Sequence, residues 1–272
     1  MEDILLNQKK TQSIYRYILE KINQDGALHF TLIDPDPTRQ NPIKAANMAK
    51  YAEEAGSDAI LIGGSTIFDQ NFVDTTIDMI KKEVNIPIII FPGGATNISA
   101  KADAIFFMSL LNSEDPYFII GQQALTSYTI KITGLDYISM AYLIIEPGAI
   151  AGWIGKARLL PRKRPKLTTA YALAAEMFGF KMIYLEAGSG SERIPEEHIE
   201  MCSKILNIPL IVGGGVGNKE DAKTFVEAGA DIVVMGTFLE NNVLKDNGTS
   251  LKGIIEEIKS AGSIQKKNYS IN

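Results

Sequence analysis

Eight short aliphatic runs recur along this chain, and they constrain its fold more than any other feature. Each run ends in a turn that contains Gly, Asp, Glu or Ser, and most are followed by a polar-apolar segment of helical period. Near-continuous apolar strands are typical of a parallel sheet that helices cover on both faces. The runs occupy residues 27–34, 58–64, 86–94, 102–110, 140–148, 181–190, 208–215 and 231–238.

Eight strands that alternate with helices in 272 residues predict an α/β fold, a single (β/α)8 barrel domain over residues 1–272. We expect an additional amino-terminal helix at residues 8–22 and a polar tail, residues 263–272, that frays. Only residues 97–101 leave room for a helix between the third and fourth runs, so the third helix should be incomplete.

Two parts of the chain are similar in sequence, and we call this similarity the internal echo. Residues 54–63 (EAGSDAILIG) resemble residues 227–236 (EAGADIVVMG), and Asn85-Ile-Pro recurs as Asn207-Ile-Pro. A doubled half-barrel would explain this echo. The alternative is convergence on the same helix-to-strand loop chemistry, with Gly at a helix end and Asp or Asn before the strand.

Composition excludes several classes of protein. The 27 Lys and Arg against 32 Asp and Glu leave a net charge of −5, which argues against general nucleic-acid binding. The single cysteine, Cys202, and the two histidines, His29 and His198, exclude a disulfide framework and a multi-Cys or His-rich metal site. The amino terminus carries Glu2 and Asp3 where a secretory signal would be positive, and no run approaches about 18 apolar residues. We therefore expect a cytoplasmic protein.

The carboxyl ends of the strands form the mouth of such a barrel, where the chemistry gathers. Glycines follow the last three strands, and a phosphate site is commonly built from the loops after strands seven and eight. Gly213 to Gly215 and Gly236-Thr237 fall in those two loops, with Gly188 and Ser189 one loop earlier. They predict a phosphate site, and tight-turn glycines are the alternative.

Acidic side chains also follow the strands. Asp34 ends the first strand, and Ser65 follows the second. Carboxylate and hydroxyl oxygens suit Mg²⁺, which proteins usually bind through one or two groups plus substrate phosphates. We therefore interpret Asp34 and Ser65 as metal ligands, with an Asx-type turn as the alternative for Asp34, and Asp36 as a turn residue.

Glu186, which Tyr184 precedes by two residues, is the candidate general base or hydrogen-bond acceptor for substrate hydroxyls; a capping or salt-bridged acid is the alternative. His29 is interpreted as an interior histidine, His198 as exposed on an acidic helix face, and Cys202 as a core residue.

A basic run follows the fifth strand and contains Lys156, Arg158, Arg162, Lys163, Arg164 and Lys166. It indicates a second anion site, for a diphosphate, with Lys156 and Arg162 as candidates; a solvated loop is the alternative. Trp153 just upstream could line an apolar groove or form a subunit contact. For the groove itself, residues 150–153 and 117–120 are the candidates.

Six segments carry a family resemblance. HFTLIDPDP, GGST, EPGAIAGWIGKARLLPRKRPKLTTAYALAAEMFG, YLEAGSG, VGGGVGN and MGTF lie between His29 and Glu240. Through them the chain resembles the geranylgeranylglyceryl phosphate synthase family, which includes the bacterial heptaprenylglyceryl phosphate synthases. One departure is His29, where family members often carry Lys.

The resemblance implies a Mg²⁺-dependent prenyltransferase. Such an enzyme forms an ether bond between the C3 hydroxyl of sn-glycerol 1-phosphate and a polyprenyl diphosphate, here geranylgeranyl diphosphate, and releases diphosphate. It implies Asp34 and Ser65 as magnesium ligands, Glu186 and Tyr184 as catalytic residues, and a homo-oligomer, and it allows peripheral membrane contact through the lipid product. The glycerol-phosphate site that it implies comprises Tyr184, Leu185, Glu186, Ala187, Gly188, Ser189, Gly190, Gly214, Gly215, Gly236 and Thr237.

Two other functions stay open at this stage. A barrel that grips phosphate could act as an isomerase or lyase on a sugar- or indole-glycerol phosphate, or it could bind phosphate without catalysis. Neither needs a metal site at Asp34 and Ser65 or a long apolar groove. The sequence does not determine the prenyl chain length, the number of subunits or the residues that contact diphosphate.

Overall fold

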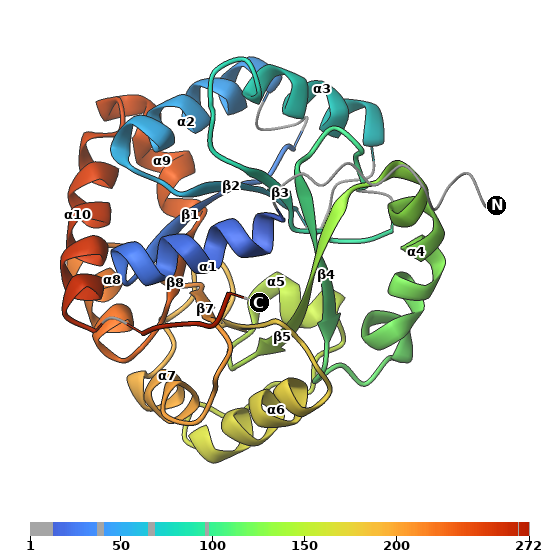
Figure 1. The fold of residues 1–272 in the computed structure, drawn as a ribbon, viewed down its shortest axis with the longest axis vertical. Helices are drawn as coiled ribbons and strands as arrows, with labels where there is room; N and C mark the ends of the chain where they lie inside the picture. Colours follow the sequence, from blue (N-terminus) through green and yellow to red (C-terminus); the bar gives the residue numbers. More distant parts are fainter. Residues whose placement is uncertain (1–12, 37–40, 65–68, 96–97, 266, 272) are drawn as a thin grey trace.

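The computed structural model describes residues 13–36, 41–64, 69–95, 98–265 and 267–271, and the side chains of residues 238–241 are not described. Eight parallel strands close into a barrel in which each strand pairs with its neighbours in chain order and the eighth pairs with the first. The predicted (β/α)8 barrel is confirmed (Figure 1). The strands are β1 (Leu28–Ile33), β2 (Ala59–Ile62), β3 (Ile88–Ile90), β4 (Ala104–Leu110), β5 (Asp136–Ile144), β6 (Met182–Glu186), β7 (Leu210–Gly213) and β8 (Ile232–Met235).

Helices surround the barrel. They are α1 (Ile14–Asp25), α2 (Pro42–Ala55), α3 (Gln70–Ile80), the π-helix η2 (Tyr117–Gly121), α4 (Gln122–Thr133), α5 (Ala149–Ile154), α6 (Pro165–Met177), α7 (Glu196–Ser203), α8 (Lys219–Glu227), α9 (Thr237–Asp246) and α10 (Thr249–Ile264). Irregular chain joins β3 to β4 over the described residues of that connection, as the short spacing predicts. No helix in the described part of the chain is long and apolar enough to cross a membrane.

The core has two layers because successive strand residues point to opposite faces. Leu28 and Phe30 of β1 point into the barrel, and Ile33 points outward to the helices. In β6, Tyr184 belongs to the inner layer, whereas Leu185 and Ala187 belong to the outer one. This alternation determines which residues near the strand ends can reach the mouth.

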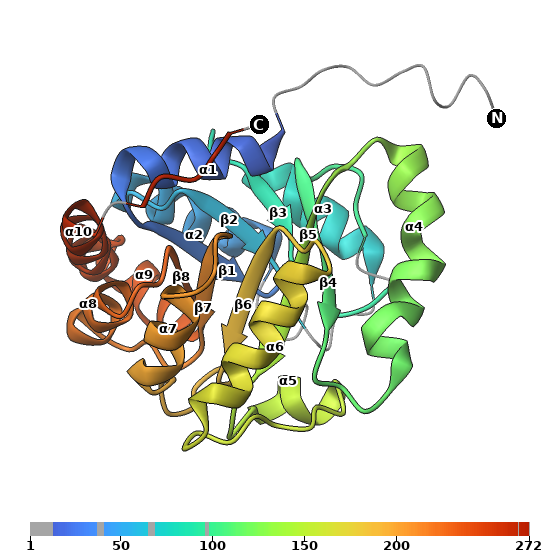
Figure 2. The ribbon, with the colours of Figure 1, turned by 60° about the horizontal axis from the view of Figure 1, so that its bottom comes forward.

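The additional amino-terminal helix closes the end of the barrel opposite the mouth. Helix α1 lies across that end in Figure 1, and Figure 2 shows α5 at the other end. Ile18 and Ile22 of α1 pack into the inner core. The backbone N–H of Ile14 and the Ser13 hydroxyl both donate hydrogen bonds to the Asp136 carboxylate. The helix begins at Ile14, and the earlier part of the predicted helix, residues 8–12, lies outside the described residues.

The expectation that the carboxyl-terminal tail frays is wrong for residues 267–269. Lys267 forms an ion pair with the buried Asp231 at 3.1 Å, and the Tyr269 hydroxyl donates to the same carboxylate at 2.7 Å. The Tyr269 backbone and the Asn23 side chain exchange two hydrogen bonds. A polar tail is ordered here because it supplies partners to a buried acid.

Candidate functional site

Glu186 is the central side chain of the mouth. It follows Met182 and Tyr184 on the inner face of β6, so its carboxyl group lies inside the ring of strands, and only 6% of the residue is exposed. One oxygen accepts the Gly188 N–H at 2.6 Å, and the hydroxyls of Tyr142 and Tyr184 also donate to the carboxylate. Among the residues that the structure describes, the partners of Glu186 are neutral donors, which does not support the alternative interpretation as a salt-bridged acid.

Burial dominates the electrostatics of Glu186. Removal from water raises the pKa of its carboxyl to about 7, and the donated hydrogen bonds oppose this rise without cancelling it. The pKa values of the two tyrosines are held well above their usual range, first by burial and then by the Glu186 charge. Both hydroxyls therefore stay protonated donors, while the carboxyl can gain or lose a proton near neutral pH.

Two cavities meet at Glu186. The smaller, about 320 Å³, is lined mostly by the turns after β6, β7 and β8. The larger, about 490 Å³, is lined by Asp34 and Asp36 near the mouth, by apolar side chains of β4, and by Gln122, Gln123, Thr126 and Ile130 of α4. Five residues line both cavities: Leu32, Glu186, Ser189, Gly236 and Thr237.

The smaller cavity gathers most of the predicted phosphate-site residues. Tyr184, Glu186, Ser189, Gly190, Gly214, Gly215, Gly236 and Thr237 all line it. The backbone at Gly214 and Gly215 has φ of +83° and +74°, where a Cβ would collide with Glu186 and with the Arg193 backbone respectively. Glycine at these positions therefore leaves room for the Glu186 carboxyl and the Arg193 backbone, and both glycines line the cavity. Helix α9 begins at Thr237 beside it.

Three predicted residues of that site do not line the cavity. Leu185 and Ala187 point outward and pack in the outer core. Gly188 is buried and donates its N–H to Glu186. These three contribute by shaping the β6 turn rather than by facing the cavity.

The structure describes one of the two predicted metal ligands. Asp34 follows Leu32 on the inner face of β1 and lines the larger cavity together with Asp36. Ser65 lies outside the described residues. Among the residues that the structure describes, no three His, Cys, Asp or Glu side chains gather into a metal-binding cluster.

The basic loop does not converge on either cavity. Lys156 forms an ion pair with Asp115 at 2.7 Å. Arg162 donates to the backbone carbonyl oxygens of Glu146 and Arg193, and so connects the loops after β5 and β6. Neither side chain lines a cavity. Of the groove candidates, Phe118, Ile150 and Ala151 line the larger cavity, whereas Trp153 is 84% exposed.

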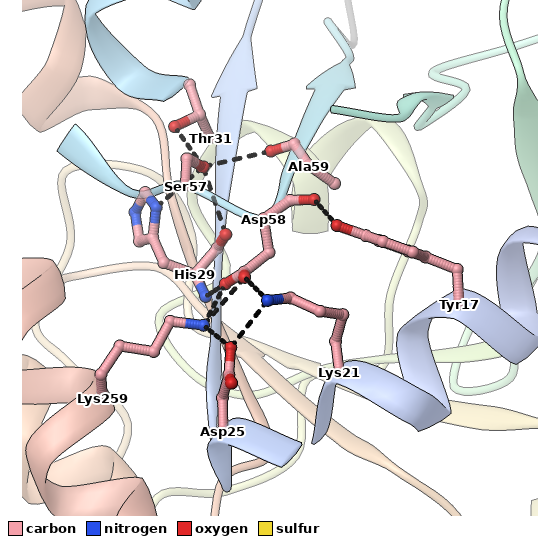
Figure 3. A network of polar contacts seen from close by, with 9 residues as sticks. All are labelled: Tyr17, Lys21, Asp25, His29, Thr31, Ser57, Asp58, Ala59 and Lys259. Atoms are coloured by element: carbon pink, nitrogen blue, oxygen red, sulfur yellow. Dashed lines mark hydrogen bonds and ion pairs between the residues drawn. The ribbon is translucent and has the colours of Figure 1, made fainter. Parts of the chain in front are cut away.

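His29 lies far from this chemistry, near the closed end of the barrel. It points outward from β1, is fully buried, and its Nδ1 lies 3.1 Å from the Ser57 hydroxyl (Figure 3). Burial lowers the pKa of the imidazole to about 3, and the nearby Lys259 charge adds to this. The ring is therefore neutral, and its interpretation as an interior histidine is confirmed.

The interpretation of His198 as exposed is wrong. The residue is fully buried, with Nδ1 at 2.8 Å from the Thr168 hydroxyl and Nε2 at 2.8 Å from the Arg162 carbonyl. His198 lies on the face of α7 that packs against α6, whereas the acidic residues Glu197 and Glu200 lie on the exposed face. Cys202, one turn later, is a core residue as predicted, and burial raises the pKa of its thiol to about 11.

Sequence reasoning missed Tyr142 and Phe91. Tyr142 stands opposite Tyr184 in the β5–β6 register, and Phe91 follows β3 directly. The available signal was alternation: Tyr142 shares the inner face of β5 with Met140 and Ile144, so it had to point into the barrel.

Comparisons with known proteins agree with this geometry. Residues 18–258 match the PcrB family. A geranylgeranylglyceryl phosphate synthase of Pyrococcus horikoshii is 47% identical over 236 residues, 86% of this chain and 92% of the relative. One of Methanosphaera stadtmanae is 50% identical over 229 residues, 84% and 93% of the two chains. The crystal structure of (S)-3-O-geranylgeranylglyceryl phosphate synthase from Thermoplasma acidophilum, in complex with substrate sn-glycerol-1-phosphate, matches with a TM-score of 0.87 and 42% identity, and the match covers 92% of this chain and 100% of that one.

Proposed function

The chain belongs to the PcrB family, and we propose that it is a prenyltransferase. The reaction joins the C3 hydroxyl of sn-glycerol 1-phosphate to the prenyl group of a polyprenyl diphosphate and releases diphosphate. The expected donor is geranylgeranyl diphosphate. One observation carries this proposal: a glycine-lined cavity and a longer, partly apolar cavity meet at a buried carboxyl group whose pKa is about 7.

The smaller cavity suits the acceptor, sn-glycerol 1-phosphate. Backbone N–H groups of the Gly214-Gly215 turn and the amino terminus of α9 favour an anion there, and the Thr237 hydroxyl adds a donor. Glu186 and Ser189 line the same cavity and can hydrogen-bond the glycerol hydroxyls. The phosphate then anchors the acceptor with its alcohol toward Glu186.

The larger cavity suits the donor, a polyprenyl diphosphate. Phe107, Met108 and Ile130 line this cavity and give an apolar surface for an isoprenoid chain, next to the polar side chains of Gln122, Gln123 and Thr126. Its outer part carries the two acids of the β1 turn, Asp34 and Asp36. A diphosphate bound at this outer part would place the allylic carbon next to Glu186.

Two acids beside a diphosphate repel it unless a cation lies between them. Asp34 and Asp36 supply the hard oxygen donors that Mg²⁺ prefers, and one or two carboxylates together with substrate phosphates commonly complete such a site. The donor set therefore fits Mg²⁺, with Asp34 as its principal protein ligand. When bound, Mg²⁺ would neutralise charge on the diphosphate as it leaves.

Glu186 acts on the acceptor hydroxyl. As a carboxylate it accepts a hydrogen bond from the C3 hydroxyl, and it takes the proton when the ether bond forms. Tyr142 and Tyr184 donate to it and thereby fix its orientation. Placing both substrates at this junction converts a bimolecular encounter into a reaction between aligned groups.

A direct assay tests the function. Purified protein with Mg²⁺ and labelled sn-glycerol 1-phosphate is incubated with prenyl diphosphates of graded length, and the lipid-extractable label is measured. The proposal predicts extractable product that depends on Mg²⁺ and on the prenyl donor. No product with any donor, or turnover of a sugar phosphate without metal, would refute it. A homo-oligomer and a cytoplasmic location stay predictions.

A further inference from the structure

Three aromatic rings stand at the junction of the two cavities, and the proposed function so far uses only two hydroxyl groups among them. The Phe91 ring stacks on the Tyr184 ring at a centroid distance of 5.2 Å and an interplanar angle of 13°. Tyr142 stands edge-on to both, at 5.6 Å from Phe91 and 5.2 Å from Tyr184. We call Phe91, Tyr142 and Tyr184 the aromatic cluster.

The cluster lies between the places proposed for donor and acceptor. Phe91 and Tyr142 line the larger cavity, and Tyr184 lines the smaller one. The three rings lie near the carboxyl ends of β3, β5 and β6, and Phe106 of the intervening β4 stands edge-on to Phe91 at 6.1 Å. The two tyrosine hydroxyls are occupied by Glu186, and the ring of Phe91, which has no polar atom, lines the donor cavity together with Asp34 and Asp36.

We propose that the aromatic cluster, and Phe91 in particular, stabilises positive charge on the allylic carbon during transfer. This inference rests on the proposed prenyl transfer. The bond between C1 of the prenyl chain and the diphosphate oxygen breaks, and its electron pair leaves with the diphosphate. The glycerol C3 oxygen forms the new bond to C1, and the hydroxyl proton goes to Glu186.

The electron-rich face of an aromatic ring attracts a cation, and the attraction is strongest where water is excluded. The site offers that setting, since Tyr142 and Tyr184 are buried and Phe91 is half-buried. Water near an allylic cation would also compete with glycerol phosphate as nucleophile. Aromatic rings exclude this water, whereas polar side chains would bind it. An aliphatic side chain could fill the same space but could not supply this attraction.

The experiment separates charge stabilisation from packing. Phe91 is replaced by phenylalanine analogues with one, two or three ring fluorines, which keep the shape of the ring and progressively weaken its negative face. The single-turnover rate is measured with enzyme in excess over geranylgeranyl diphosphate, so that the chemical step is observed. The control carries the same analogues at Phe225, a residue of α8 that is fully buried in the outer core.

The proposal predicts that the logarithm of the single-turnover rate falls in proportion to the number of fluorines at position 91, and that it does not change in the Phe225 series. Phe91→Leu should lower the rate by about ten- to thirtyfold, the range that one desolvated cation-π contact supports, with the KM for glycerol phosphate unchanged. A rate independent of fluorination refutes the inference while leaving prenyl transfer intact. A wild-type protein that makes no prenyl product refutes the proposed function, and this inference with it.

Discussion

Replacing Glu186 by Gln should stabilise the protein at alkaline pH while it removes activity. The pKa of this carboxyl rises from its ordinary value of 4.5 to about 7 on folding. Below pH 4.5 the carboxyl is neutral in both the folded and unfolded states, so its shifted pKa does not lower the free energy of unfolding. Between 4.5 and 7 the unfolded chain ionises first, and the free energy of unfolding falls as pH rises. Above pH 7 the folded protein carries the full free-energy cost of burying the ionised carboxylate.

The size of that penalty follows from the shift. A pKa change from 4.5 to about 7 corresponds to about 3 kcal/mol. Gln keeps an oxygen that can accept the Gly188 N–H, and it resembles the neutral acid, so the variant escapes the penalty at every pH. We expect the variant's advantage in free energy of unfolding over wild type to be about 2 to 3 kcal/mol greater at pH 8 than at pH 5.

Urea unfolding of wild type and E186Q at pH 5 and pH 8, at one protein concentration, measures this difference. The wild-type transfer rate should also rise with pH through about 7, as the carboxylate forms, and E186Q should lack that rise. An advantage of E186Q that is the same at both pH values would refute the assignment of a buried acid with a raised pKa. It would also remove the reason for treating Glu186 as the base.

Three further variants test other parts of the site and the core. Gly214→Ala should raise the KM for sn-glycerol 1-phosphate by about tenfold or more. The control Gly179→Ala should leave the KM unchanged, because Gly179 has a similar positive φ of +89°, a Cβ there meets no atom within 4 Å, and the residue lines neither cavity; equal effects would contradict the role of the turn. Asp34→Asn should abolish Mg²⁺-supported transfer without changing the melting temperature, and unchanged turnover would exclude it as a ligand. His198→Ala should lower the free energy of unfolding by about 2 kcal/mol, because it leaves the Thr168 hydroxyl buried without its partner; a loss within error would mean that water replaces the imidazole.

The barrel could be predicted from the sequence because each strand is a short aliphatic run bounded by turn residues. Seven of the eight predicted runs contain an observed strand and the fifth overlaps one, and the short β3–β4 connection follows from residue counting alone. The strand bounds were less accurate. Strand β5 begins at Asp136, four residues before the apolar run, because pairing with β4 continues across Tyr137 and Ser139. Such polar or half-exposed strand residues do not extend the apolar pattern. They belong to the strand because they pair with β4, and that pairing is not visible in the local sequence.

The site was predictable where backbone chemistry dictates residue type and unpredictable where packing decides. Gly214 and Gly215 carry their function in their residue type, since only glycine fits the turn. Phe91 and Tyr142 look like any other aromatic residues of strands, and their role follows from which faces the barrel turns toward the cavity. Lys156 is a case in which residue type misleads. As a cation near the mouth it was predicted to bind an anion, but it forms an ion pair with Asp115, which is distant in the sequence.

The internal echo of the sequence belongs to the closed end of the barrel rather than to its mouth. In both copies of the repeated segment the aspartate precedes a strand and accepts the backbone N–H of a residue in the neighbouring strand: Asp58 accepts from His29, and Asp231 accepts from Leu210.

Each of these buried acids also pairs with a lysine of the carboxyl-terminal part, Asp58 with Lys259 and Asp231 with Lys267 (Figure 3 shows the first). Asp103 repeats the arrangement with the Ile88 N–H and Lys81, although its sequence shares only Asp-Ala-Ile with the first copy and lacks the preceding Glu-Ala-Gly. The same requirement, a partner for an N–H at the start of a strand, has therefore been met at a third loop that lacks most of the repeated segment. That favours convergence on one loop chemistry over duplication of a half-barrel as the explanation of the echo.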